Sequence, residues 1–201
     1  MTSLILGTAE FNPAGYANIA PLEDAEKRRI LGLARECGIN MIDTAESYNS
    51  GEFIKNNAKG FCIYTKTRDW KVQLDWGQNE LRGILYHYQP TENPIQLPFI
   101  HRWVNLGVSV YDQAQIPDER RILQIPYNIE MPEFERCFTT HRNVFVRSVF
   151  GRGTLLETHT LAGCLAGVLK HRPDGIIVGV KSARELEDII LAWESLHEKQ
   201  G

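Results

Sequence analysis

The stretch ILGLARECGINMIDTAESY (30–48) carries the pattern that decides the fold. Its first eight residues place apolar side chains at helical spacing, and Gly38 is the kind of residue at which a helix ends. The apolar run 40–42 then predicts a short strand, and polar residues begin directly after it at Asp43. This part of the chain therefore predicts a helix that leads into a buried strand with a polar end.

The same pattern recurs along the chain. Eight apolar runs are too short and too continuous for amphipathic helices, and they predict strands buried on both faces: 4–6, 40–42, 62–64, 84–86, 106–108, 122–124, 144–146 and 176–178. Helices are predicted at 22–37, at 158–171 and from the capping-box sequence Ser182-Ala183-Arg184-Glu185 onward. Weaker signals predict a helix over 133–140, a short or irregular one between Asp69 and Gly83, and barely one turn at 113–118.

Strands that alternate with helices predict an α/β fold with a parallel sheet. Chains with a (β/α)8 barrel typically run to about 250 residues, which argues against a barrel in a chain of this length. Eight strands in 201 residues nevertheless leave enough for a strand and a minimal helix in each unit. An open doubly wound sheet is the alternative, but no glycine-rich phosphate turn follows the first strand at 7–11. We therefore predict a compact (β/α)8 TIM barrel that forms a single domain over residues 1–201.

Composition excludes several classes of protein. The chain is 43% hydrophobic and has a formal charge of −3, which argues against a general nucleic-acid or membrane binder. No apolar run approaches the roughly 20 residues that span a bilayer, and the first residues do not resemble a secretory signal, so we expect a cytoplasmic protein. The four cysteines lack CxxC spacing, which predicts reduced core thiols and neither a zinc site nor a disulfide framework.

Polar side chains follow three consecutive predicted strands. Asp43 follows the second strand, Lys66 the third and His87 the fourth, and Tyr48 lies five residues after Asp43. Each has an ordinary structural explanation when taken alone, as a turn cap, a solvated strand end, a hydrogen-bonded histidine or a packed aromatic. In a barrel, however, the carboxyl ends of the strands carry the active site, so the four should converge there.

These four residue types suit proton donation to an oxygen. A phenol has a pKa of about 10 and is a poor acid at neutral pH, but a nearby ammonium stabilises the phenolate. We expect Lys66 to tune Tyr48, Asp43 to hold Lys66, and His87 to orient the substrate oxygen. Reduction of a carbonyl by hydride is the reaction that matches this arrangement.

The segment Gly38-Ile39-Asn40-Met41-Ile42-Asp43-Thr44-Ala45-Glu46-Ser47-Tyr48 resembles the signature of the aldo-keto reductases, G-[IV]-N-x-[IF]-D-T-A-x-x-Y. The resemblance extends over nearly the whole chain. Shorter matches follow in the family's order at 6–8, 64–66, 85–87, 106–109, 124–128, 146–155 and 177–182.

The resemblance implies an NADPH-dependent, reversible reduction of an aldehyde or ketone. Asp43, Tyr48, Lys66 and His87 would be the family's catalytic tetrad, with Tyr48 as the general acid. Gln124 would contact the nicotinamide, the 148–155 loop would cover the pyrophosphate, and residues at 181–184 would surround the adenosine 2′-phosphate. The implied cofactor-binding residues are Gly7, Thr8, Ser109, Gln124, Ser148, Phe150, Gly151, Arg152, Gly153, Leu155, Lys181, Ser182 and Arg184; no metal is implied.

The chain departs from the family pattern in three ways. Val110 replaces an asparagine that holds the nicotinamide carboxamide, and Ile189 replaces one that contacts adenine; both changes concern cofactor affinity. The connecting loops are short and the usual C-terminal extension is missing, which predicts an exposed catalytic mouth. Four aromatic residues in or beside the remaining long loops could line a pocket or only pack: Trp70, Trp76, Tyr88 and Trp103.

Two functions are therefore compared. The first is an NADP(H)-dependent carbonyl reductase that acts on a small molecule such as a sugar derivative. The second is a catalytically silent barrel that serves as an NADPH-binding or protein-interaction module. The complete tetrad favours the enzyme, whereas the two missing asparagines favour the silent barrel. The sequence determines neither the substrate, the direction of reaction nor the oligomeric state.

Overall fold

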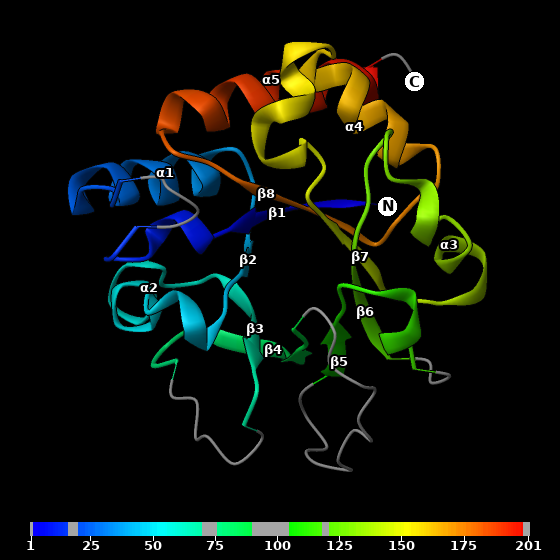
Figure 1. The fold of residues 1–201 in the computed structure, drawn as a ribbon. Coiled ribbons are helices and arrows are strands. Elements are labelled where there is room, and N and C mark those ends of the chain that lie inside the picture. Colours follow the sequence, from blue (N-terminus) through cyan, green and yellow to red (C-terminus); the bar gives the residue numbers. More distant parts are fainter. Residues whose placement is uncertain (1, 16–19, 70–75, 90–104, 118–120, 199–201) are drawn as a thin grey trace.

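A computed structural model describes residues 2–15, 20–69, 76–89, 105–117 and 121–198. Its centre is a closed barrel in which eight strands pair in chain order and β8 returns to β1 (Figure 1). Every pairing is parallel. The predicted TIM barrel is confirmed, and each of the eight predicted strands is present.

Seven of the eight strands are longer than the apolar runs that predicted them, and the second is as long as its run but begins one residue later. They are β1 (Ser3–Gly7), β2 (Met41–Asp43), β3 (Cys62–Thr67), β4 (Glu80–His87), β5 (Asn105–Ser109), β6 (Ile122–Pro126), β7 (Val144–Arg147) and β8 (Gly175–Gly179). The extra residues extend mainly toward the carboxyl ends, because polar side chains there remain in the ladder while they face the mouth of the barrel.

Three outer helices confirm their predicted positions: α1 (Asp24–Glu36), α4 (Leu161–Leu169) and α5 (Ala183–Glu198). Helix α1 ends where Gly38 takes a φ of 76°, with the Ile39 N–H donating to the Ala34 carbonyl, as in a Schellman motif. Helix α4 begins later than predicted, because Thr160 caps it by accepting a hydrogen bond from the Gly163 N–H at 3.0 Å. Helices α4 and α5 pack side by side over the barrel, as Figure 1 shows.

The weaker helix predictions need correction. A 3-10 turn, η4 (Pro132–Phe134), and the single turn α3 (Cys137–Thr140) replace the predicted helix over 133–140. Between Asp69 and Gly83 the described residues form a turn at 76–79 and then the start of β4, with no helix among them. The short helix α2 (Gly51–Asn57) was not predicted. The predicted single turn is η3 (Gln113–Gln115), and the remaining 3-10 segments are η1 (Ala9–Phe11), η2 (Glu46–Tyr48) and η5 (Gly151–Glu157).

The hydrophobic core has two parts. The larger part lies between the strands and the helices, whereas a smaller cluster fills the lower barrel interior and consists of Ile5, Leu85, Ile122, Phe145 and Ile177. Trp76 and Tyr88 belong to the larger core, so these two predicted pocket candidates are packing residues. Trp70 and Trp103 lie outside the described residues.

The prediction that the cysteines are core thiols is correct for two of the four. Cys137 and Cys164 are buried in the core, but Cys37 is exposed and Cys62 is partly exposed; all four are free. Cys37 lies just past the last turn of α1, where the apolar face of the helix no longer meets the barrel.

We predict opposite effects for two glycine-to-alanine substitutions. A Cβ at Gly107 would lie 2.2 Å from the backbone oxygen of Ile122, so Gly107→Ala should destabilise the fold by about 2–4 kcal/mol. A Cβ at Gly32, inside α1, would meet nothing within 4 Å, so Gly32→Ala should stabilise it by about 0.5–1 kcal/mol. Urea unfolding of both variants measures the difference, and equal stabilities would contradict the barrel register.

Candidate active site

Strand alternation turns one residue from the end of each strand toward the mouth of the barrel, and in β1 and β8 this residue is a glycine. Residues two positions apart on a strand face the same side of the sheet. The residues that lie two positions after the apolar side chains of the lower interior therefore form a second layer, nearer the carboxyl ends of the strands. This upper layer consists of Gly7, Asp43, Lys66, His87, Ser109, Gln124, Arg147 and Gly179. The barrel interior is thus apolar below and polar at its carboxyl end.

A buried network joins the ends of four strands. The Lys66 Nζ lies 2.5 Å from Asp43 Oδ2, and the other oxygen of Asp43 accepts a hydrogen bond from Gln124 Nε2 at 2.7 Å. The Ser109 hydroxyl donates to Gln124 Oε1 at 2.6 Å. All four residues are at least 95% buried, and these three contacts hold both oxygens of Asp43 and both ends of the Gln124 amide.

Tyr48 and His87 lie above this network. Tyr48 is the last residue of the 3-10 turn η2. The Thr67 hydroxyl, at the end of β3, donates a hydrogen bond to Glu46 Oε2 of this turn at 2.7 Å and so fixes the turn to the strand. The Lys66 Nζ lies 5.2 Å from the centre of the Tyr48 ring. The His87 ring meets the Tyr48 ring edge to face at 6.1 Å. The structure therefore brings all four predicted tetrad residues together.

Burial and neighbouring cations determine the protonation of the histidine. Burial lowers the pKa of His87 to about 3, and the charges of Lys66, Arg147 and Arg68 act in the same direction. The imidazole is therefore neutral at physiological pH and can donate one hydrogen bond. Burial also lowers the pKa of Lys66, but the ion pair and hydrogen bond to Asp43 oppose this shift and favour the ammonium.

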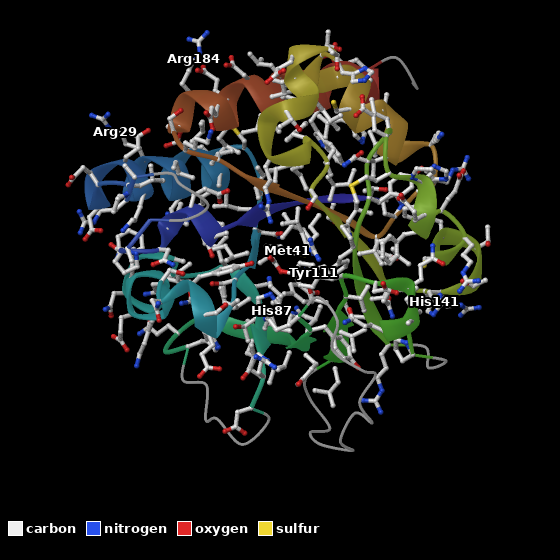
Figure 2. The ribbon with its side chains drawn as sticks, in the orientation of Figure 1. Arg29, Met41, His87, Tyr111, His141 and Arg184 are labelled. Carbon is white, nitrogen blue, oxygen red and sulfur yellow. The ribbon has the colours of Figure 1, made fainter. Side chains whose placement is uncertain are left out.

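Arg147, at the end of β7, was not predicted as a site residue. Its Nη2 donates to the Val110 carbonyl at 2.7 Å, and its guanidinium lies 4.4 Å from the centre of the Tyr111 ring. In Figure 2 His87 and Tyr111 lie near the middle of the barrel. The strand-end argument used for Lys66 and His87 would have found Arg147 as well, had it been applied to the strand that begins at Val144.

Glu10 is a second group that sequence reasoning missed. It lies in η1, after β1, and its carboxylate fills the space above Gly179, where a Cβ would be 2.6 Å from Oε2. That oxygen is buried and has no hydrogen-bond partner among the described residues. Burial raises the pKa of Glu10 to about 6, with a further contribution from Glu185.

Several residues predicted to bind a cofactor already have hydrogen-bond or packing partners within the protein. The Thr8 N–H and hydroxyl both donate to the Asp43 carbonyl, at 3.0 and 3.2 Å, which ties β1 to β2. Gly7 is closely packed, since a Cβ there would lie 3.1 Å from Ile177 Cγ2. Ser109 and Gln124 have almost no exposed surface and serve the Asp43 network.

The loop after β7 has an unusual backbone. Ser148, Gly151, Arg152 and Gly153 all have positive φ angles, between 55° and 96°, although two of them are not glycine. The Asn128 side chain fixes the start of the loop through a 3.1 Å hydrogen bond to the Ser148 carbonyl, and Leu155 is buried in the core beside the partly buried Phe150. Such strain is typical of a loop that binds a ligand.

Comparison with known proteins agrees with this geometry. The model of the aldo/keto reductase family matches residues 3–106, which include all four tetrad residues, and the chain belongs to this family. The family consists of oxidoreductases that use nicotinamide cofactors. Comparison with curated protein sequences gave no match.

Solved structures with the same fold include several members of the family. The holo form of aldo-keto reductase AKR11C1 from Bacillus halodurans is 16% identical with a TM-score of 0.65, over 96% of this chain and 86% of that one. The thermostable aldo-keto reductase Tm1743, solved with the inhibitor epalrestat, is 20% identical with a TM-score of 0.63, over 96% and 90%. The aldose reductase of Schistosoma japonicum is 15% identical with a TM-score of 0.60, over 98% and 87%.

The described residues contain no group of three or more His, Cys, Asp and Glu side chains that could hold a metal ion. None of the described helices is both long enough and apolar enough to span a bilayer.

We predict that Glu10 makes stability depend on pH. Because its pKa is raised from 4.5 to about 6 in the folded state, its favourable contribution is complete below pH 4.5 and is lost as pH rises through 6. Glu10→Gln should therefore stabilise the protein more at pH 8 than at pH 5, by about 1 kcal/mol. Urea unfolding at both pH values measures this; Glu157→Gln, an exposed carboxylate, is the control and should show no such difference.

Proposed function

We propose that the protein reduces an aldehyde or ketone to an alcohol with NADH or NADPH, with Tyr48 as the general acid. The observation that carries the proposal is the buried Lys66–Asp43 ion pair directly beneath the Tyr48 ring. A buried ion pair costs more desolvation free energy than a pair of apolar residues, which makes a purely structural role a poor explanation.

Lys66 lets Tyr48 act as an acid. An ammonium 5.2 Å from the phenol ring stabilises the phenolate that remains after the proton has moved to the carbonyl oxygen of the substrate. Asp43 keeps this ammonium in place, and Gln124 and Ser109 keep Asp43 in place. The low dielectric of the buried network strengthens the interaction.

His87 positions the substrate. Because its pKa is about 3, the neutral ring donates a hydrogen bond to the carbonyl oxygen without protonating it. Its edge-to-face contact with the Tyr48 ring supports the proposal that both side chains donate to the same oxygen. The proton therefore comes from Tyr48, and His87 selects the orientation of the carbonyl.

A reduced nicotinamide dinucleotide supplies the hydride when it is bound. The loop 148–155 offers this group the exposed guanidinium of Arg152, which suits an anion such as a pyrophosphate. The Gly151 and Gly153 N–H groups donate to the Ser148 and Phe150 carbonyls, at 3.0 and 2.8 Å, and so hold the shape of the loop. We propose that Ser148, Gly151, Arg152 and Gly153 hold it. The sequence predicts NADP(H), a small-molecule substrate and a cytoplasmic location, and these remain predictions.

Tyr48→Phe should abolish carbonyl reduction without unfolding the protein. Loss of the acid should lower kcat by a factor on the order of 10² to 10⁴. Tyr127→Phe is the matched control, because that hydroxyl is bonded to His171 Nε2 at 2.7 Å outside the barrel mouth. Turnover of a panel of aldehydes and sugars with NADH and NADPH measures the effect. If wild-type turnover does not exceed that of Tyr48→Phe, the silent-barrel alternative is supported.

Lys66→Met should lower the rate and shift the pH profile of kcat toward higher pH, since Tyr48 loses its neighbouring ammonium. This variant also leaves the Asp43 carboxylate buried without a partner, which destabilises the fold by about 3–5 kcal/mol. The double variant Asp43→Asn with Lys66→Met removes both charges and keeps the test interpretable. A pH profile that stays at its wild-type position in both variants would rule out the role assigned to Lys66.

A further inference from the structure

The protein's own acceptors already bind three N–H groups at the start of helix α5. The Lys181 N–H donates to Glu185 Oε2 and the Ala183 N–H donates to Glu26 Oε1, both at 2.7 Å. The Glu185 N–H donates to the Ser182 hydroxyl at 3.1 Å. A helix N-terminus binds an anion through such N–H groups. Here two carboxylates occupy the positions that a phosphate would need.

The basic side chains at this helix end do not provide another binding site for a phosphate. Arg184 points away from the barrel in Figure 2, its side chain is 79% exposed, and its Nε lies 3.3 Å from Asp188 Oδ1 on the next turn. Lys181 is exposed as well. Two of the residues predicted to surround a 2′-phosphate are therefore a solvated lysine and an arginine engaged elsewhere, and Ser182 is an N-cap.

A third carboxylate faces the same region. Glu10 lies against Gly179 at the end of β8, two residues before Lys181, and it interacts electrostatically with both Lys181 and Glu185. Its buried Oε2 has no partner among the described residues and can accept a hydrogen bond. Glu26 pairs with Arg29 at 3.4 Å, so Glu10 and Glu185 are the two carboxylates that face the Lys181 ammonium where the sequence predicted the 2′-phosphate.

We propose that this protein takes NAD(H) rather than NADP(H), because Glu10 and Glu185 recognise a free ribose 2′-hydroxyl and repel a 2′-phosphate. A carboxylate is an acceptor for a ribose hydroxyl, whereas a phosphate beside it is a like charge in a partly desolvated place. The inference rests on the proposed function, since it requires that a nicotinamide dinucleotide binds. It replaces the NADP(H) that the resemblance implied.

Calorimetric titration with AMP and with adenosine 2′,5′-bisphosphate isolates the effect of the 2′-phosphate, since the two probes differ only at that position. We expect the wild type to bind AMP at least about tenfold more tightly than the 2′-phosphorylated analogue. Glu185→Gln should narrow that ratio by about threefold or more, and Glu10→Gln should act in the same direction. Glu187→Gln, an exposed carboxylate two residues further along α5, is the matched control and should leave the ratio unchanged.

The same titrations with NADH and NADPH separate the possible failures. Tighter binding of NADPH, or a ratio that Glu185→Gln does not change, overturns the assignment of NAD(H) and leaves carbonyl reduction intact. If neither dinucleotide binds, both the assignment and the proposed function fail. Tighter binding of NADH together with carbonyl turnover supports both, and tighter NADH binding without turnover supports the assignment alone.

Discussion

The ion pair between Lys66 and Asp43 is the interaction on which the site depends. Two charges removed from water cost several kcal/mol each unless they meet at close range and their remaining hydrogen-bonding groups are satisfied. The 2.5 Å contact, the Gln124 amide and the Ser109 hydroxyl meet that condition. Each of these side chains comes from a different strand, so the charge pair is stable only in a closed barrel.

The interior of the barrel has two layers, and this arrangement allows the two charges to be buried together with their hydrogen-bond partners. Apolar side chains such as Ile5 and Phe145 fill the lower part and exclude water, while the polar layer above them lies toward the mouth. Lys66 therefore sits at the boundary between the two, fully buried but close to Tyr48 and His87. Burial at this boundary lowers the pKa of both Lys66 and His87, but only Lys66 has a carboxylate partner, Asp43, which favours its charged form, so the histidine is neutral.

Different parts of the fold were predictable to different extents. The strands and the helices α1, α4 and α5 follow from apolar periodicity, because buried faces repeat with the period of the element. Single turns replace the helix expected over 133–140, and the short helix α2 was not predicted. Segments of one or two turns are determined by packing more than by their own periodicity. Glu10 could not be predicted from the sequence, because its burial depends on Gly179 of the paired strand β8, where the lack of a side chain leaves room for the carboxylate.

The sequence by itself determined the barrel and the family, since strand alternation and the segment 38–48 are local patterns that do not depend on what they contact. Only the tertiary structure decided what the polar residues do. In the folded protein the Gln124 amide donates to Asp43, and the carboxylates of Glu185 and Glu26 accept hydrogen bonds from N–H groups at the start of α5. The physical reason is that hydrogen-bond partners and like charges meet across elements far apart in the chain, at distances that no local pattern encodes.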